Sequence, residues 1–76
     1  MSPREAILAA ARIGVDADTA EEGFIEIRTL TGMTCSDTEL AEAVAAAVRD
    51  GHVRDPVCLL PGALQCRWRL ELERHA

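Results

Sequence analysis

The chain has 76 residues, of which 49% are hydrophobic, and a formal net charge of −5. This length predicts a single domain spanning residues 1–76, and the hydrophobic share is too high for a disordered chain. Thirteen acidic residues against eight arginines count against a general polyanion binder, although a local group of arginines still acts within a Debye length of about 8–10 Å.

The first predicted helix spans Pro3 to Ile13. Ser2 is a typical capping residue, Pro3 suits the first helical position, and Glu5 lies three residues after the cap. Together they form a capping box. Apolar residues follow at helical spacing, and Gly14 is a natural stop.

The second predicted helix begins after Asp18 or Thr19, each of which has a glutamate three residues later. Its apolar residues Phe24 and Ile27 share one helical face, and Gly32 ends it. The residues before this helix, 16–19, are interpreted as a polar break.

Two features leave an alternative open in this region. Gly23 lies inside the predicted helix, where it costs up to about 1 kcal/mol relative to alanine. The β-branched residues Ile25 and Ile27 also fit a strand over residues 25–28. The caps and the three-residue spacing favour the helix.

The third predicted helix is the clearest element of the chain. Ser36 and Glu39 form its capping box, and Gly51 closes it. Its apolar stripe consists of Leu40, Val44, Ala47 and Val48.

After Gly51 the apolar period changes to two, which predicts two strands joined at Pro61-Gly62. Proline and glycine suit the two central positions of a type II turn. In the second strand, polar residues alternate with four residues expected on the buried face, and Trp68 is expected to anchor the core. These four are Cys66, Trp68, Leu70 and Leu72.

A tight turn would pair Val53 with Leu70 and place Arg54 opposite Arg69, with Arg67 on the same face. Arginines directly across a sheet repel each other, so this register needs solvent, a nearby acid or a bound anion to offset them. A bulge would change the register, and a slip of one residue would move every side chain to the other face.

The arginines of the hairpin therefore have two interpretations. One is a solvated outer face, and the other is an anion-binding surface to which Arg49, at the end of the third helix, adds a fourth member. In the register above, Pro56 lies opposite Arg67 and Cys58 opposite Gln65.

No enzyme signature is found in the sequence, since it lacks a phosphate loop and a paired-acid motif. His52 near Cys58 or Cys66 suggests a thiol–imidazole pair, but no third orienting group is evident. A polar residue at a helix exit is therefore the preferred interpretation of His52. We expect no catalytic residue, cofactor or small-molecule ligand.

The cysteines and the apolar runs bear on location. Cys35, Cys58 and Cys66 have no zinc-site spacing, so we expect no metal and interpret them as reduced, partly buried thiols. The sequence contains neither a signal peptide nor an apolar run of about 18 residues. We therefore expect a cytoplasmic protein without a membrane partner.

Three helices followed by a hairpin resemble a winged helix-turn-helix domain. LTGMT, residues 30–34, is similar to the end of the second helix and the turn in bacterial transcription regulators of this class. RDGHVR, residues 49–54, is similar to the exit from the recognition helix into the wing, with Pro61-Gly62 as the wing tip. The resemblance implies an α+β fold, a small winged-helix-like domain with three helices and a C-terminal two-stranded β-hairpin.

Two departures from this family pattern matter. The chain carries more residues between Gly32 and Gly51 than the common family spacing, which would lengthen the turn before the third helix. The helix that reads the major groove in DNA-binding members presents Asp37, Glu39 and Glu42 here. Base contacts usually come from Arg, Lys, Asn and Gln, and acids repel phosphates.

Two functions follow from the resemblance. One is a DNA-binding domain of a small transcription-regulator-like protein, with double-stranded DNA as its partner. Its contacts would come from Thr38, Arg49, Arg54, Arg67 and Arg69. The alternative is a winged-helix module for protein–protein contact or homodimerisation without DNA, which uses an acidic, alanine-rich helical face.

Overall fold

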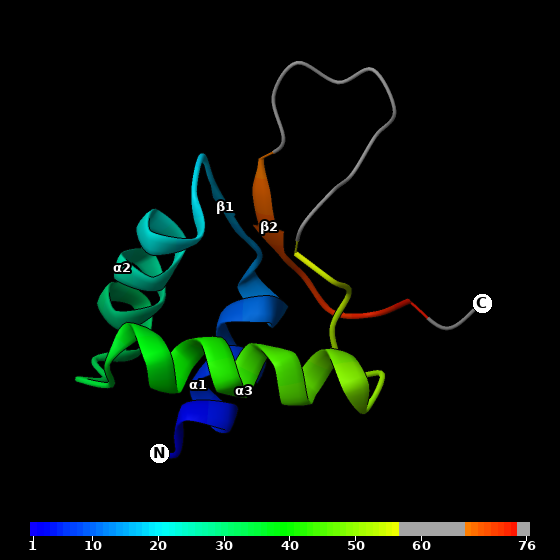
Figure 1. The fold of residues 1–76 in the computed structure, drawn as a ribbon, viewed down its shortest axis with the longest axis horizontal. Helices are drawn as coiled ribbons and strands as arrows, with labels where there is room; N and C mark the ends of the chain where they lie inside the picture. Colours follow the sequence, from blue (N-terminus) through cyan, green and yellow to red (C-terminus); the bar gives the residue numbers. More distant parts are fainter. Residues whose placement is uncertain (57–66, 75–76) are drawn as a thin grey trace.

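The structure, a computed structural model, describes residues 1–56 and 67–74. Within these ranges the chain forms three helices and a two-stranded antiparallel sheet (Figure 1). In chain order the elements are α1 (Pro3–Ile13), β1 (Val15–Ala17), α2 (Ala20–Thr31), α3 (Asp37–Arg49) and β2 (Trp68–Leu70). The predicted α+β class is confirmed at this level.

The helices begin at predicted caps because side-chain oxygens satisfy backbone N–H groups that have no partner within the helix. The hydroxyl oxygens of Ser2 and Ser36 accept hydrogen bonds from the N–H groups of Glu5 and Glu39, each at 3.2 Å. Thr19 caps α2, so the strand alternative over residues 25–28 is wrong. Gly32 ends α2 with a φ of 72°, a left-handed conformation that favours glycine.

Strand β1 is absent from the sequence prediction, which treats residues 16–19 as a polar break. Val15 and Ala17 are buried on either side of exposed Asp16. A strand of three residues is too short to produce a clear alternating pattern. Its pairing partner lies at the other end of the chain.

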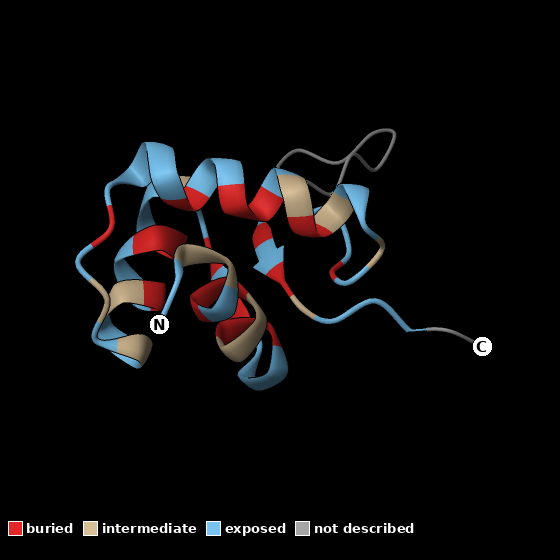
Figure 2. Cartoon of the chain, turned by 90° about the horizontal axis from the view of Figure 1, so that it is seen from below, coloured by how far each residue is buried: buried red, intermediate tan, exposed pale blue. Residues whose placement is uncertain are grey.

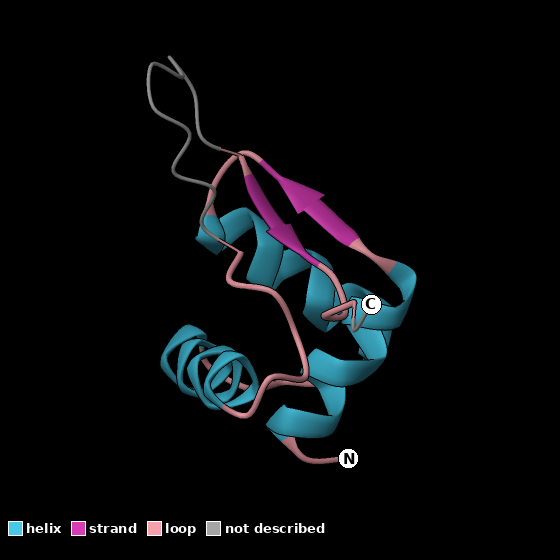
Figure 3. Cartoon of the chain, turned by 90° about the vertical axis from the view of Figure 1, so that its right-hand side faces the viewer, coloured by secondary structure: helices cyan, strands magenta, loops and turns pink. Residues whose placement is uncertain are grey.

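The segment that contains β2 has an antiparallel neighbour on each side. β1 pairs with β2 so that Val15, Asp16 and Ala17 face Leu70, Arg69 and Trp68 (Figure 3). On the other side, a bridge joins Val53 to Leu72. Backbone hydrogen bonds extend this second pairing, from Arg54 N–H to the Glu71 carbonyl at 3.1 Å and from Arg69 N–H to the Pro56 carbonyl at 3.2 Å.

The predicted hairpin register is therefore wrong by two residues. Val53 pairs with Leu72 rather than Leu70, and Arg54 lies opposite Glu71 rather than Arg69. The observed register places opposite charges across the sheet, which is favourable, where the predicted one placed two arginines. A displacement of two residues leaves each side chain on the face predicted for it.

The same register changes the partners of other residues. Pro56 accepts a backbone hydrogen bond from Arg69, so the predicted pairing of Pro56 with Arg67 is wrong. Leu72 is 38% exposed and so does not share the burial of Trp68 and Leu70. The predicted turn at Pro61-Gly62, and the predicted positions of Cys58, Cys66 and the neighbouring apolar residues, lie outside the described residues.

The core lies where the helices meet one another and the inner face of the sheet. Its largest fully buried side chains are Ile7, Ile27, Leu40, Leu70, Val15 and Val53. Helix α3 crosses α1 (Figure 1), and this is the most extensive helix–helix contact. Buried alanines on both helices allow close approach, and the buried residues of α3 lie on its inward side (Figure 2).

Trp68 is the aromatic anchor of the core, as predicted, and is 6% exposed. Its ring stands edge-on to Phe24, with ring centroids 5.7 Å apart and an interplanar angle of 75°. Trp68 also lies directly over Gly23, where a Cβ would come within 2.3 Å of ring atoms Cε3 and Cζ3. The glycine inside α2 therefore provides the space that the indole occupies.

Candidate functional site

The predicted arginine cluster lies on the sheet face that points away from the helices. We call this surface the charged sheet face and define it by three arginines and three carboxylates. They are Arg54, Arg67, Arg69, Asp16, Asp18 and Glu71. The side chains alternate with buried Val15, Ala17, Trp68 and Leu70, which explains their shared orientation.

Each of the three arginines on this face has a carboxylate partner. Arg54 Nη1 lies 3.1 Å from Glu71 Oε1, and Arg69 Nε lies 3.6 Å from Glu71 Oε2. Arg67 Nε lies 3.2 Å from Asp16 Oδ1 and 3.9 Å from Asp18 Oδ1. The face therefore carries equal numbers of positive and negative side chains.

These ion pairs are open to solvent, since the three arginine side chains are 58–67% exposed. Exposed pairs contribute only about 0–1 kcal/mol each to stability. Their main consequence is electrostatic, because the carboxylates offset the positive potential that the arginines would otherwise present to a polyanion.

The two other predicted DNA contacts belong to α3, on the opposite side of the sheet from these arginines. Thr38 is exposed in the first turn, between Asp37 and Glu39. Arg49 is exposed in the last turn. The structure groups Arg54, Arg67 and Arg69 on one face and does not bring Thr38 or Arg49 to it.

Two further arginines hold the helices together. Arg28, in α2, reaches Asp37 Oδ1 at 2.6 Å and donates to the Cys35 carbonyl at 3.2 Å. Arg4, in α1, bonds to Asp50 just after α3. This hydrogen bond from Arg4 is the main cause of the lowered pKa of Asp50.

An apolar groove lies between α3 and the residues beside β2. We call it the α3 groove; it has a volume of about 400 Å³. Exposed Ala41 and Ala45 and half-buried Val48 form its helical side. The complete lining is Phe24, Ala41, Val44, Ala45, Val48, Arg49, Asp55, Pro56 and Trp68.

The groove was not predicted from the sequence, because it depends on three segments that are distant along the chain. The stripe expected on α3 includes Val44 and Val48, and both line the groove. One signal was available. Ala41 and Ala45 form a second apolar row that runs, at spacings of four and three, to Val48 of the predicted stripe.

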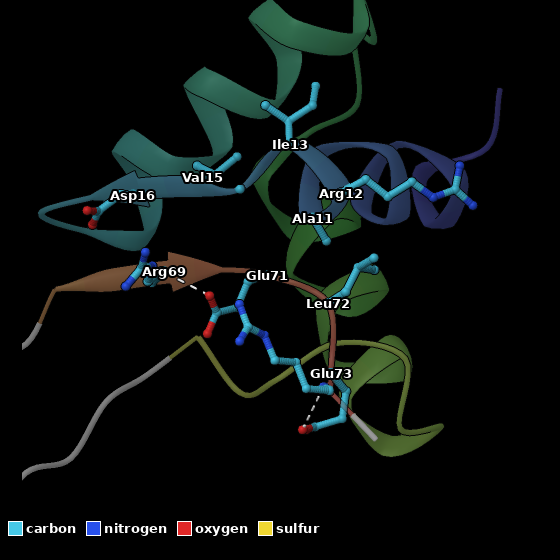
Figure 4. A pocket seen from close by; sticks show the side chains of 11 residues that line it. Ala11, Arg12, Ile13, Val15, Asp16, Arg69, Glu71, Leu72 and Glu73 are labelled. Carbon is cyan, nitrogen blue, oxygen red and sulfur yellow. Dashed lines mark hydrogen bonds and ion pairs between the residues drawn. The ribbon is translucent and has the colours of Figure 1, made fainter. Parts of the chain in front are cut away.

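A second hollow lies between the end of α1, β1 and the residues after β2, and has a volume of about 560 Å³ (Figure 4). Its charged lining residues are Arg12, Asp16, Arg69, Glu71, Glu73 and Arg74. Positive and negative side chains are equal in number here, and Figure 4 shows Arg69 directed to Glu71. The hollow therefore favours neither an anion nor a cation.

Cys35 is a buried free thiol, and exposed His52 is the one histidine among the described residues. Within the described ranges, no three His, Cys, Asp or Glu side chains gather as a group able to hold a metal ion. The helices of the described chain are too short or too polar to cross a bilayer. Cys58 and Cys66, which were the predicted partners of His52, lie outside these ranges.

Comparisons with protein-family models, with curated proteins and with solved structures found no match for this chain. We therefore infer function from the charged sheet face and the α3 groove.

Proposed function

We propose that this chain is a winged-helix domain that acts as a protein-interaction module. The winged-helix assignment is supported by three helices followed by antiparallel pairing of residues 52–56 with residues 69–73. It is also supported by the LTGMT and RDGHVR segments described above. β1 adds a further strand beside β2.

The observation that carries the choice of function is the charge balance of the sheet face. Phosphate binding needs arginines whose charge is available, since affinity comes from neutralising phosphates and releasing counterions. Here Glu71 lies against Arg54 and Arg69, and Asp16 lies against Arg67. Each carboxylate offsets the charge that a phosphate would meet at its arginine and repels the phosphate.

The first turn of α3 supports the same choice. Asp37 and Glu39 flank Thr38 at the end of the helix that would read bases. The apolar α3 groove, in contrast, offers a surface of the kind that proteins bury against each other.

DNA binding through Thr38, Arg49, Arg54, Arg67 and Arg69 stays a prediction, and it has a direct test. We expect the unchanged chain not to bind random duplex DNA even at low salt. The Glu71→Gln variant, in which Arg54 and Arg69 lose their carboxylate partner, should bind this DNA more tightly than the unchanged chain. Calorimetric titration at ionic strengths of about 0.01 M and 0.15 M checks both. Salt-sensitive binding by the unchanged chain, abolished by Arg67→Ala with Arg69→Ala, would establish the DNA function instead.

The interaction function is tested in cells that naturally produce the chain. A photo-crosslinking amino acid replaces Ala45 in the groove or, as the matched control, Arg67 on the charged sheet face. We expect one protein to be crosslinked from position 45 and not from position 67. Recovery of DNA from position 67, or of nothing specific from position 45, would contradict the proposal.

A further inference from the structure

We propose that the α3 groove binds a cationic amphipathic helix of a partner protein. This inference rests on the proposed function and specifies its partner. The floor of the groove is formed by two aromatic side chains, Phe24 and Trp68, and its helical side by small or branched apolar residues. Such a surface fits the apolar face of a helix, which docks through residues spaced three and four apart.

The shape of the helical side favours a helix as the occupant. Ala41 and Ala45 are one turn apart, and both are exposed. Their single methyl groups keep the surface low, so that another helix can approach α3 closely. Val48, one turn further on, and Pro56 then contribute the larger apolar contacts.

The charge of the partner follows from two acids beside the groove, which outnumber Arg49, the one cation in the described lining of the groove. Glu42 lies three residues before groove-lining Ala45, and Glu21 lies three residues before Phe24, so each belongs to the same helical side as a lining residue. Both are exposed, and neither makes an ion pair with any described residue. The carboxylates of the charged sheet face, in contrast, already have arginine partners.

Net charge strengthens the argument for a cationic partner. The chain carries −5 overall, and α2 adds Glu22 and Glu26 to its exposed surface. Complementary charges around an apolar centre guide association and select among partners. Lys or Arg residues beside the apolar stripe of the partner helix would therefore meet Glu21 and Glu42.

The experiment uses the full chain and three designed peptides of about 18 residues, or five helical turns. The first has a Leu/Ala stripe flanked by Lys and Arg, the second the same stripe flanked by Glu, and the third the composition of the first in scrambled order. Isothermal titration calorimetry measures affinity. We expect the first to bind at least about tenfold more tightly than the others, and less tightly as salt increases.

Variants locate the binding site. Ala45→Arg places a long cationic side chain in the groove and should abolish binding. Ile25→Arg is the matched control, because Ile25 is an exposed α2 residue that does not line the groove, and it should bind normally. Glu42→Arg should weaken binding about tenfold, whereas Glu26→Arg should have a smaller effect.

The outcomes separate this inference from the proposed function. Equal binding of the Lys/Arg and Glu peptides, or no peptide binding together with a protein crosslinked from position 45, would overturn the cationic helix and leave the interaction function intact. A dimer that Ala45→Arg dissociates would assign the groove to a second copy. Nuclear Overhauser contacts from groove methyls to residues 57–66 would assign it to this chain. Each of these two results overturns the inference.

Discussion

The contact between Gly23 and Trp68 reverses the effect on stability that is expected when a glycine inside a helix is replaced. In an exposed helix, Gly23→Ala would add up to about 1 kcal/mol of stability. Here the new Cβ would come within 2.3 Å of the indole, and overpacking of this kind costs about 1–3 kcal/mol. We therefore expect Gly23→Ala to lower the free energy of unfolding, as measured by urea denaturation.

The control for this prediction is the same substitution in a Trp68→Phe background. The smaller ring leaves room for the Cβ, so Gly23→Ala should be less destabilising there, or stabilising. An equal loss in both backgrounds would mean that the indole is not the cause. The sequence predicted the burial of Trp68 from its alternation with Leu70, but it could not show that Gly23 lies beneath the ring.

At the scale of elements, the cap of α1 links stability to pH. Ser2 N–H donates to Glu5 Oε1 at 3.1 Å, and this bond is the main cause that lowers the pKa of Glu5 below its ordinary 4.5. A lowered pKa means that the charged carboxylate stabilises the folded state. That contribution is present above pH 4.5 and is lost as the pH falls through the lowered value.

Glu5→Gln tests this linkage, because glutamine keeps the capping hydrogen bond and cannot titrate. We expect the melting temperature of this variant to fall less between pH 7 and pH 3 than that of the unchanged chain, as followed by circular dichroism. Parallel declines would show that Glu5 does not contribute to acid sensitivity.

The elements also show what local sequence signals can predict. The helix caps depend on residues within one turn, so Ser2 and Ser36 were identifiable from the sequence, and the cap of α2 was limited to Asp18 or Thr19. β1 has only three residues, and its partner is distant in the chain. The hairpin register was wrong because it was counted outward from an assumed tight turn at Pro61-Gly62, whereas Val53 pairs with Leu72.

At the scale of the whole molecule, β2 lies near the end of the described chain, pairs with β1 near its beginning, and packs on the same core. Leu70 is fully buried, whereas Leu72 is 38% exposed. Leu70→Ala should therefore cost about 2–5 kcal/mol, out of roughly 5–10 kcal/mol for a domain of this size. Leu72→Ala should cost clearly less, and urea unfolding followed by circular dichroism measures both.

The comparison of these two leucines also tests how far the inner face of the sheet is covered. If Leu72→Ala proved as costly as Leu70→Ala, Leu72 would be buried, as expected from the sequence. Because the domain is small, we also expect the Leu70→Ala variant to lose its helices and its sheet pairing together, in a single unfolding transition. The candidate site belongs to this scale, since the α3 groove exists only when α2, α3 and β2 are assembled.

The position of Trp68 has a practical consequence. It is the only tryptophan in the chain, and its ring both rests on α2 and lines the α3 groove. Its fluorescence therefore reports on two events without any attached dye. Unfolding should shift the emission to longer wavelength as water reaches the indole, and a molecule entering the groove should change the emission while the fold stays intact.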